Sequence, residues 1–217
     1  MKILLPCIIC VLVFASTASA QKKYDRWSIG FNPLSMGESM SSVGPCIAYR
    51  ISPRVELWGE TSFIFYNLYQ LTNWQHLKGY RFIFQPRYYT GEKRSFFIAP
   101  EFRIKHFSYT TALDFINSAI PDTLRQYAHK SSQLLVGGAL VLGKQLILSS
   151  RHHLFLEITA GVGAKQRYIT RKNIPAGYEY KITLGGFGLQ PHYEWDNDGT
   201  PYFPVGFRLI WKLNRKG

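Results

Sequence analysis

Apolar and polar residues alternate with a period of two along most of this chain of 217 residues. The alternation recurs in segments of about 9 to 13 residues that are bounded by turn-forming residues, a pattern that indicates β-strands. Only over Leu113–Tyr127 does a helical period fit the apolar residues. The pattern predicts eight strands, which span Trp27–Met36, Ser42–Ile51, Val55–Tyr66, Leu77–Tyr89, Phe96–Tyr109, Gln133–Leu148, His153–Ile169 and Tyr202–Leu213.

The segments between the predicted strands alternate in length. Three of them are short: Ser52–Arg54, Thr90–Ser95 and Ser149–His152. The others are mostly longer: Asn67–Gln75, Thr110–Ser132 and Thr170–Pro201, with Gly37–Ser41 as the short exception. Short turns at one end and longer loops at the other are typical of an up-and-down outer-membrane barrel. We therefore predict one all-β domain, an eight-stranded antiparallel up-and-down transmembrane β-barrel.

The two faces of each predicted strand differ in side-chain size as well as in polarity. In Phe96–Lys105, one face consists of Phe, Ile and Pro residues, whereas the other includes a Glu, an Arg and a Lys. Because the interior of an eight-stranded barrel is only just wide enough for side chains, faces crowded with Phe and Leu would overfill it. We therefore expect the apolar faces in lipid. A soluble lipocalin-like carrier would need the inverse arrangement, with Phe82, Phe84 and Phe102 inside.

Charged residues of the predicted strands fall on the faces that we expect to point inward. A charged residue facing lipid costs roughly 2–4 kcal/mol at the midplane, whereas opposite charges inside a narrow barrel can pair. We predict a lumen charge network that closes the barrel, formed by Glu56, Glu60, Arg81, Arg87, Glu101, Arg103, Lys105, Glu157, Lys165 and Arg208. The alternative is a narrow channel for small solutes, whose conductance would change on neutralising Glu101 or Arg103.

Strands rather than helices are expected to cross the membrane. The longest mainly apolar stretch after residue 20, Leu134–Leu148, contains Lys144 and three glycines. It falls short of the roughly 20 apolar residues that a spanning helix needs. Aromatic rings near strand ends favour the headgroup level of a bilayer. We predict interfacial aromatics at Trp27, Trp58, Tyr66, Tyr80, Tyr88 and Trp211.

The first 20 residues have the pattern of a secretory signal peptide. Lys2 supplies a basic start, Ile3–Phe14 is apolar, and Ala18–Ala20 is a small-residue cleavage signal. We expect cleavage before Gln21, which leaves the barrel domain over residues 21–217. Two of the three cysteines lie in the signal, so no intrachain disulfide is expected after cleavage.

Patterns that would point to catalysis or to a cofactor are weak. His152 and His153 are adjacent, but neighbours on a strand point to opposite faces, and no metal-ligand spacing occurs. Gly185–Gly188 lacks the strand–helix context of a dinucleotide site. Some outer-membrane barrels modify lipids with Ser, His and an acid, and two sets of residues are candidates for such roles: Ser131, His129 and Asp122, and His192, Glu194 and Asp196. Their spacing does not require it, so we expect no enzyme, metal or cofactor.

The predicted long loops are candidate contact surfaces. We expect part of Thr110–Ser132 to form an amphipathic helix at the barrel rim. Thr170–Pro201 is rich in aromatic residues, which suits contact with an extracellular protein or glycan, or a self-packed rim. The net charge is +13, but the basic residues are interleaved with strands, which argues against nucleic acid. Rim Lys and Arg residues would instead attract phosphates of outer-membrane lipid and lipopolysaccharide.

Three segments carry a resemblance to a known group of proteins: Trp27–Leu34, Val43–Arg54 and Phe203–Leu213. With the strand pattern, they make the chain similar to the small outer-membrane β-barrels of Gram-negative bacteria. That group includes the OmpA transmembrane domain, OmpX, OmpW and single-barrel proteins of Bacteroidetes. The resemblance implies a location in the cell outer membrane, both termini in the periplasm, and insertion by the barrel-assembly machinery. Such barrels usually end on an aromatic residue, whereas this chain continues past Trp211 to Gly217.

The function that we expect is structural or interactive and non-enzymatic. The expected role is envelope integrity, adhesion, or ligand contact through extracellular loops. The lumen is expected to be closed by charged side chains. The alternatives make distinct predictions. A narrow channel predicts unit conductance, a lipid-modifying enzyme predicts altered lipopolysaccharide acylation in a deletion strain, and a soluble carrier predicts aromatic faces inside the barrel.

Overall fold

The computed structural model describes residues 26–33, 40–67, 75–91, 95–117, 120–174, 177–180 and 199–213. Within these ranges the fold is all-β, as predicted, and the strands are β1 (Trp27–Phe31), β2 (Met40–Val43), β3 (Pro45–Arg50), β4 (Val55–Asn67), β5 (Gln75–Thr90), β6 (Phe96–Asn117), β7 (Ile120–Ser149), β8 (Leu154–Lys172), β9 (Tyr178–Tyr180), β10 (Gly199–Tyr202) and β11 (Val205–Leu213). No helix in the described ranges is long and apolar enough to cross a membrane. The predicted signal peptide, Gly185–Gly188 and the set His192, Glu194 and Asp196 lie outside the described residues.

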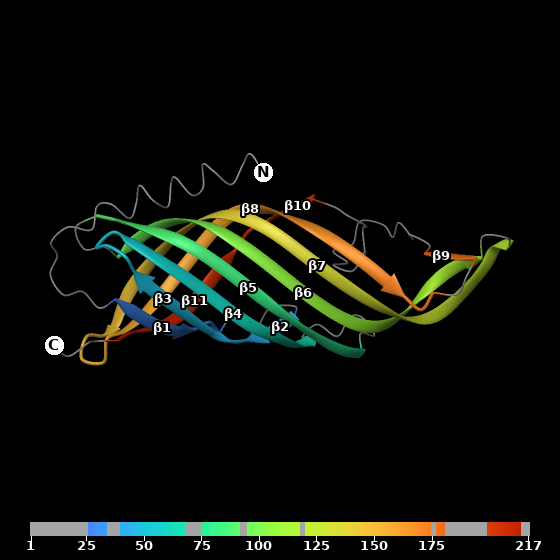
Figure 1. Ribbon diagram of the computed structural model, residues 1–217, viewed down its shortest axis with the longest axis horizontal. Helices are drawn as coiled ribbons and strands as arrows, with labels where there is room; N and C mark the ends of the chain where they lie inside the picture. The colour runs from blue at the N-terminus through green and yellow to red at the C-terminus, as the bar shows by residue number, and fades with distance from the viewer. Residues whose placement is uncertain are drawn as a thin grey trace.

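Eight of the strands form a closed antiparallel ring. The order around it is β1-β3-β4-β5-β6-β7-β8-β11, and β11 pairs with β1 to complete the circle. The shorter strands extend this ring: β2 pairs with β4, β9 with β6, and β10 with β8. Figure 1 shows the strands running obliquely to the long axis of the molecule. The predicted antiparallel arrangement is therefore confirmed.

The register around the ring is staggered. From Trp211 on β11, paired residues lead once around the ring to Pro201 on β10, through Ile29, Ile47, Gly59, Phe84, Phe102, Gly138 and Ala164. β10 and β11 pair with β8 in the same register, so they lie along one line. The circuit therefore returns to this line at Pro201, ten residues before Trp211, where it began. With a rise of about 3.3 Å per residue and a strand spacing of about 4.8 Å, this offset implies a tilt of about 40°.

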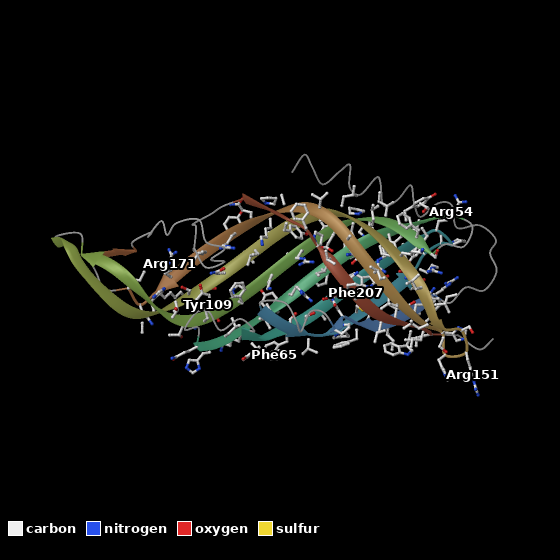
Figure 2. All side chains as sticks on the ribbon, turned by 180° about the vertical axis from the view of Figure 1, so that it is seen from behind. Arg54, Phe65, Tyr109, Arg151, Arg171 and Phe207 are labelled. Carbon is white, nitrogen blue, oxygen red and sulfur yellow. The ribbon has the colours of Figure 1, made fainter. Side chains whose placement is uncertain are left out.

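The short turns lie at one end of the ring, which we call the turn end. At Ser52–Arg54 the turn is closed by the Ile51 amide, which donates to the Val55 carbonyl over 3.0 Å. In the last turn His153 adopts a φ of 49° and its amide donates to the Ser150 carbonyl. Arg54 and Arg151 lie at the turn end in Figure 2, and Arg171 lies toward the opposite end, which we call the hairpin end.

The hairpin end differs from the prediction. Thr110–Ser132 was expected to be a loop with an amphipathic helix, and this expectation is wrong: β6 and β7 continue as paired strands to Asn117 and Ile120. β5 begins at Gln75, opposite Thr110, and β8 ends at Lys172, opposite Lys130. The hairpin therefore extends beyond both neighbouring strands (Figure 1). Its threonine, isoleucine and aromatic residues favour strands, and continuous pairing with an established register outweighs a local helical period.

The predicted strand Ser42–Ile51 appears as two strands with one common register. β2 and β3 both pair with β4, and the interruption between them is Gly44. A Cβ atom on Gly44 would collide with the backbone of Thr61 and Ser62. The chain therefore approaches β4 more closely here than any residue other than glycine permits.

Candidate functional site

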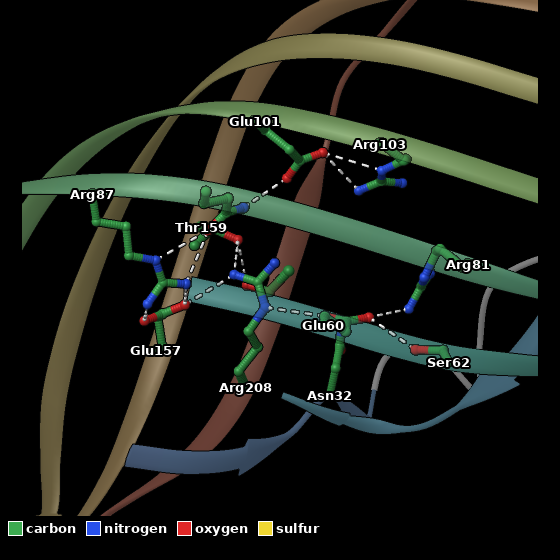
Figure 3. Close-up of polar contacts among 12 residues, drawn as sticks. Asn32, Glu60, Ser62, Arg81, Arg87, Glu101, Arg103, Glu157, Thr159 and Arg208 are labelled. Carbon is green, nitrogen blue, oxygen red and sulfur yellow. Dashed lines mark hydrogen bonds and ion pairs between the residues drawn. The ribbon is translucent and has the colours of Figure 1, made fainter. Parts of the chain in front are cut away.

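The inner face of the ring carries the ten charged residues predicted for the lumen. Seven of them are almost fully buried: Glu56, Glu60, Arg81, Arg87, Glu101, Glu157 and Arg208. The other three, Arg103, Lys105 and Lys165, share the inward strand faces but are only partly buried. Successive inward residues on one strand are two positions apart, and neighbouring strands bring them together across the ring (Figure 3).

Glu157 on β8 is the most densely bonded carboxylate. Both terminal nitrogens of Arg87 donate to it over 2.8 Å, one to each oxygen. Arg208 donates over 2.9 Å and Gln145 over 3.2 Å. The donors come from β5, β11 and β7, so a single carboxylate joins strands from different sides of the ring (Figure 3).

Glu56 on β4 extends this cluster toward the turn end. Arg50 donates to one of its oxygens over 3.1 Å, and the Tyr89 hydroxyl donates to the other over 2.9 Å. Arg87 also lies 3.3 Å from Glu56, so it bridges two carboxylates. The Tyr89 hydroxyl in turn accepts a hydrogen bond from Gln145 over 2.8 Å. These bonds form a continuous network across the interior.

Glu60, also on β4, is the centre of a third group of contacts. It pairs with Arg81 and accepts a hydrogen bond from Ser62 over 3.2 Å. Arg208 lies 3.7 Å away through its Nε atom, which links Glu60 to the Glu157 cluster. The Asn32 amide also approaches Glu60, at 3.5 Å.

Glu101 on β6 is the centre of a fourth group. Gln85 donates to it over 2.7 Å, Arg103 over 3.1 Å and the Tyr202 hydroxyl over 3.0 Å. The guanidinium of Arg103 lies over the Tyr202 ring, 5.3 Å from its centroid. Tyr202 belongs to β10, so the segment before the last strand is bonded to the opposite wall of the ring.

Trp58 was expected among the interfacial aromatics, and this expectation is wrong. Its side chain lies inside the ring and is 1% exposed. The guanidinium groups of Arg208 and Arg87 lie 4.2 and 4.6 Å from its ring centroid. The cause is strand parity: Trp58 is two residues from both Glu56 and Glu60, so all three share the inward face.

Ion pairs connect the described interior carboxylates to arginines. Each described carboxylate has an arginine partner, and burying a charge without such a partner would be clearly unfavourable. His129 and Ser131 are buried on the same inward face of β7, while the side chain of Asp122 is not described. Among the described residues, no group of three or more His, Cys, Asp or Glu side chains could hold a metal ion.

Several network residues were not singled out from the sequence. Gln85 and Tyr89 flank Arg87 at two-residue spacing, so inward parity was the signal that could have identified them. Gln145 could have been identified in the same way, because it falls on the inward face of β7. Tyr202 carried no such signal, because its contact with Glu101 depends on the long-range pairing of β10 with β8.

The outer face carries the large apolar side chains. Phe82 is 46% exposed and Phe102 is 57% exposed, and both lie on the face opposite to the charges. This is the reverse of the placement that a lipocalin-like carrier needs. Of the remaining predicted interfacial aromatics, all are exposed: Trp27, Tyr66, Tyr80, Tyr88 and Trp211.

Outward residues also change in character along the strands toward the hairpin end. An apolar row across β5, β6 and β7 consists of Phe82, Ile104 and Val136. The next row contains Tyr80, His106, Leu134 and Tyr168, and the row after it contains Lys78, Ser108, Ser132 and Thr170. The apolar row extends over three strands, since the β8 position beside Val136 is Gln166, whereas the row of hydroxyl and basic residues extends over all four.

Comparisons with known proteins identify no relative: no family model, curated protein or solved structure matches the chain. The features that bear on function are therefore the two faces of the ring. One face is a buried polar network, and the other is an exposed apolar surface.

Proposed function

We propose that this chain is an eight-stranded β-barrel that spans the outer membrane of a Gram-negative bacterium. Its role is structural or interactive, through envelope integrity, adhesion or ligand contact, and not enzymatic. The observation that carries the proposal is the inversion of polarity between the two faces. Arginines and glutamates are buried inside the ring while large apolar side chains cover its outside. Water as the external solvent would favour the opposite arrangement.

The height of the apolar surface supports a membrane location. On β4, the outward positions from Val55 to Phe65 are apolar or small and uncharged. Ten residue steps of about 3.3 Å, tilted by about 40°, reach about 25 Å along the ring axis. Transmembrane barrels present an apolar band about 25 Å tall. The apolar surface therefore has the height that a bilayer requires.

The continuity of the apolar surface supports the same conclusion. Outward residues meet across neighbouring strands, as in the pairs Phe84–Phe102 and Leu140–Val162. Soluble monomers rarely expose contiguous apolar patches larger than a few hundred Å². An apolar surface that continues from strand to strand is accommodated by lipid. Exposed Trp27 and Trp211 near the turn end suit the interface between lipid and water.

The filled interior supports a closed lumen in preference to a channel. Arg87 lies between the rings of Trp58 and Phe97, 4.6 and 4.5 Å from their centroids. Its guanidinium also pairs with Glu157. Aromatic rings and ion pairs therefore occupy the same cross-section. The hairpin that extends beyond the ring supports a contact role on the side of the longer connections.

The proposal is tested by the behaviour of the envelope-extracted protein on a denaturing gel, boiled beside unboiled. A folded membrane barrel resists the detergent, so the unboiled sample is expected to migrate differently. Fractionation should recover the protein with outer membranes. Identical mobility together with recovery in the soluble periplasm would overturn the proposal. Planar-bilayer recording then separates a closed lumen, which is silent, from a channel, which gives unit conductance.

A further inference from the structure

β10 is a short strand at an open edge of the sheet. It has four residues, Gly199–Tyr202, and in the described part of the chain β8 is the one strand that pairs with it. Pro201 has no amide hydrogen to donate. Phe203 and Pro204, which belong to no strand, separate β10 from β11. Backbone pairing alone therefore holds β10 weakly to the wall of the ring.

Tyr202 connects β10 to a strand on the far side of the lumen. Its hydroxyl donates to Glu101 over 3.0 Å, and the Arg103 guanidinium lies 5.3 Å from its ring centroid. Glu101, Ala139, Gly163 and Tyr202 form one row of paired residues across β6, β7, β8 and β10. The two residues between the ends of the row have the smallest side chains. The Tyr202 side chain therefore has room to extend along the inner face to Glu101.

Glu101 does not depend on the Tyr202 hydroxyl for its partners. Gln85 donates to one carboxylate oxygen over 2.7 Å, and Arg103 pairs with the other at 3.0 Å. A lost hydrogen bond is most costly where it leaves a buried group unsatisfied. Glu101 keeps both of these partners when the phenol moves away. The contact can therefore open without disturbing the interior ion pairs.

β10 lies at the hairpin-end edge of the apolar surface. Pro201 and Trp211 are ten residues apart on one line beside β8. At a tilt of about 40°, ten residues reach about 25 Å along the ring axis, which is the height of the apolar band of a transmembrane barrel. Unpaired backbone groups are very costly within the hydrocarbon region. At the level of β10 they can be hydrated, so separation of β10 from β8 is compatible with a membrane location.

We propose that β10 is a movable part of the wall and that the contact between Tyr202 and Glu101 is the latch that keeps it closed. When the latch opens, β10 leaves residues 163–166 of β8 and turns about the break before β11. Water and small solutes then enter from the hairpin end and reach the inward-facing Lys165. The layer that contains Arg87 stays closed nearer the turn end. The latch goes beyond the proposed function, since it gives the closed lumen one fixed closure and one movable closure.

The test is hydrogen–deuterium exchange, read by mass spectrometry on the full mature protein folded in detergent. Tyr202→Phe removes only the hydroxyl that donates to Glu101. Exchange in peptides that cover residues 199–202 and 163–166 should become at least about tenfold faster, because a hydrogen bond to a charged group is lost. Exchange in β11 should stay unchanged.

Tyr89→Phe is the matched control. The Tyr89 hydroxyl also donates to a buried carboxylate, that of Glu56, over 2.9 Å. However, Tyr89 belongs to β5, which is paired with β4 on one side and β6 on the other. The same loss of a hydroxyl should therefore leave the exchange of β10 as it is in the wild type.

A cross-link tests the movement in the opposite direction. Ala164 and Pro201 are direct partners at exposed positions of β8 and β10. The Cα atoms of direct antiparallel partners lie at distances that a disulfide can span. Cys46→Ser removes the free cysteine of the described residues, so that A164C/P201C joins β10 to β8 on oxidation. Oxidation should abolish the faster exchange that Tyr202→Phe causes, and reduction should restore it.

Unchanged exchange of β10 in Y202F, or equal acceleration in Y89F, would overturn the latch while leaving the barrel intact. Faster exchange along the whole chain in Y202F would also overturn it, because the hydroxyl would then stabilise the entire ring. If Y202F does not fold, the A164C/P201C protein decides: equal exchange of β10 in its oxidised and reduced forms would overturn the movement. The heat-modifiable band is measured separately, so failure of the barrel and failure of the latch are distinguishable.

Discussion

At the scale of single residues, the interior depends on arginines that each serve more than one carboxylate. Arg87 contacts Glu157 and Glu56 and packs against two aromatic rings. Arg208 similarly joins Glu157 and Glu60. A residue with several partners couples strands that are distant in sequence. Its loss removes a partner from more than one buried carboxylate, and the surrounding structure cannot supply water in its place without opening the ring.

Replacing Arg87 with alanine should therefore be strongly destabilising. We expect the free energy of unfolding to fall by about 3–5 kcal/mol, because buried carboxylates lose a partner. The measurement is urea titration of the protein folded in vesicles, followed by the shift of the unboiled band. Arg54→Ala is the control, since Arg54 is exposed and makes one 3.4 Å hydrogen bond to Tyr88. A loss no larger than that of the control would contradict the role assigned to Arg87.

A second residue-scale prediction concerns Gly143 on β7. A Cβ atom at this position would overlap the ring of Phe97, which fills the interior beside Arg87. Gly143→Ala should lower the free energy of unfolding by about 1–3 kcal/mol through overpacking. Adding Phe97→Leu should restore part of the loss, because the smaller side chain makes room. Strictly additive losses in the same titration would show that the two residues do not compete for space.

Strand parity made the inward charges predictable from sequence, and the error at Trp58 shows what was overlooked. Its residue type suggested a membrane interface, whereas its position between Glu56 and Glu60 fixed it to the inward face. Parity is the stronger signal because a one-residue shift would turn every side chain of β4 to the opposite face. Tyr202 could not be found in this way, since its partner Glu101 is distant in sequence.

At the scale of strands and hairpins, the ring and the extended hairpin are separable parts. β6 and β7 each have two neighbours up to Thr110 and Lys130, and beyond these residues they pair mainly with each other. β9 adds a short pairing near the tip of β6. The strand pattern predicted where β6 leaves the turn end, at Phe96, but not where it ends. The apolar residues within Leu113–Tyr127 suit a helix as well as a strand, so they do not reveal that this segment pairs as a hairpin.

Shortening the hairpin should leave the ring intact. Replacing residues 113–127 with Asn-Gly joins Ala112 to Ala128, which already face each other across the two strands. The heat-modifiable band should persist, and the free energy of unfolding from urea titration should stay within about 0.5 kcal/mol of the wild type, because the ring loses none of its pairings. Loss of the folded band would show that the hairpin contributes to ring formation. Retained folding with lost binding to cells or surfaces would assign the contact role to the hairpin.

At the scale of the whole molecule, the two possible surroundings of the ring predict opposite effects of the same substitution. Phe102 lies on the outer face and is 57% exposed. In a bilayer, Phe102→Arg should lower the free energy of unfolding of the protein folded in vesicles by about 2–4 kcal/mol. In water, the same change would cost little. Thr90→Arg, at an exposed position near the turn end, is the matched control and should cost about 0–1 kcal/mol. Equal effects would place the outer face in water.

The closure of the ring also has a consequence for how the chain reaches this fold. β1 pairs with β11, so Trp27 meets Leu213 across almost the whole chain. Contacts so distant in sequence form slowly, because the intervening chain must first be brought together. Until β11 arrives, β1 and β8 each have an open edge that can pair with another chain. Assembly is therefore completed by its most distant contact, and until the last strand is in place the edges of β1 and β8 are where the folding chain can be diverted into pairing with a second chain.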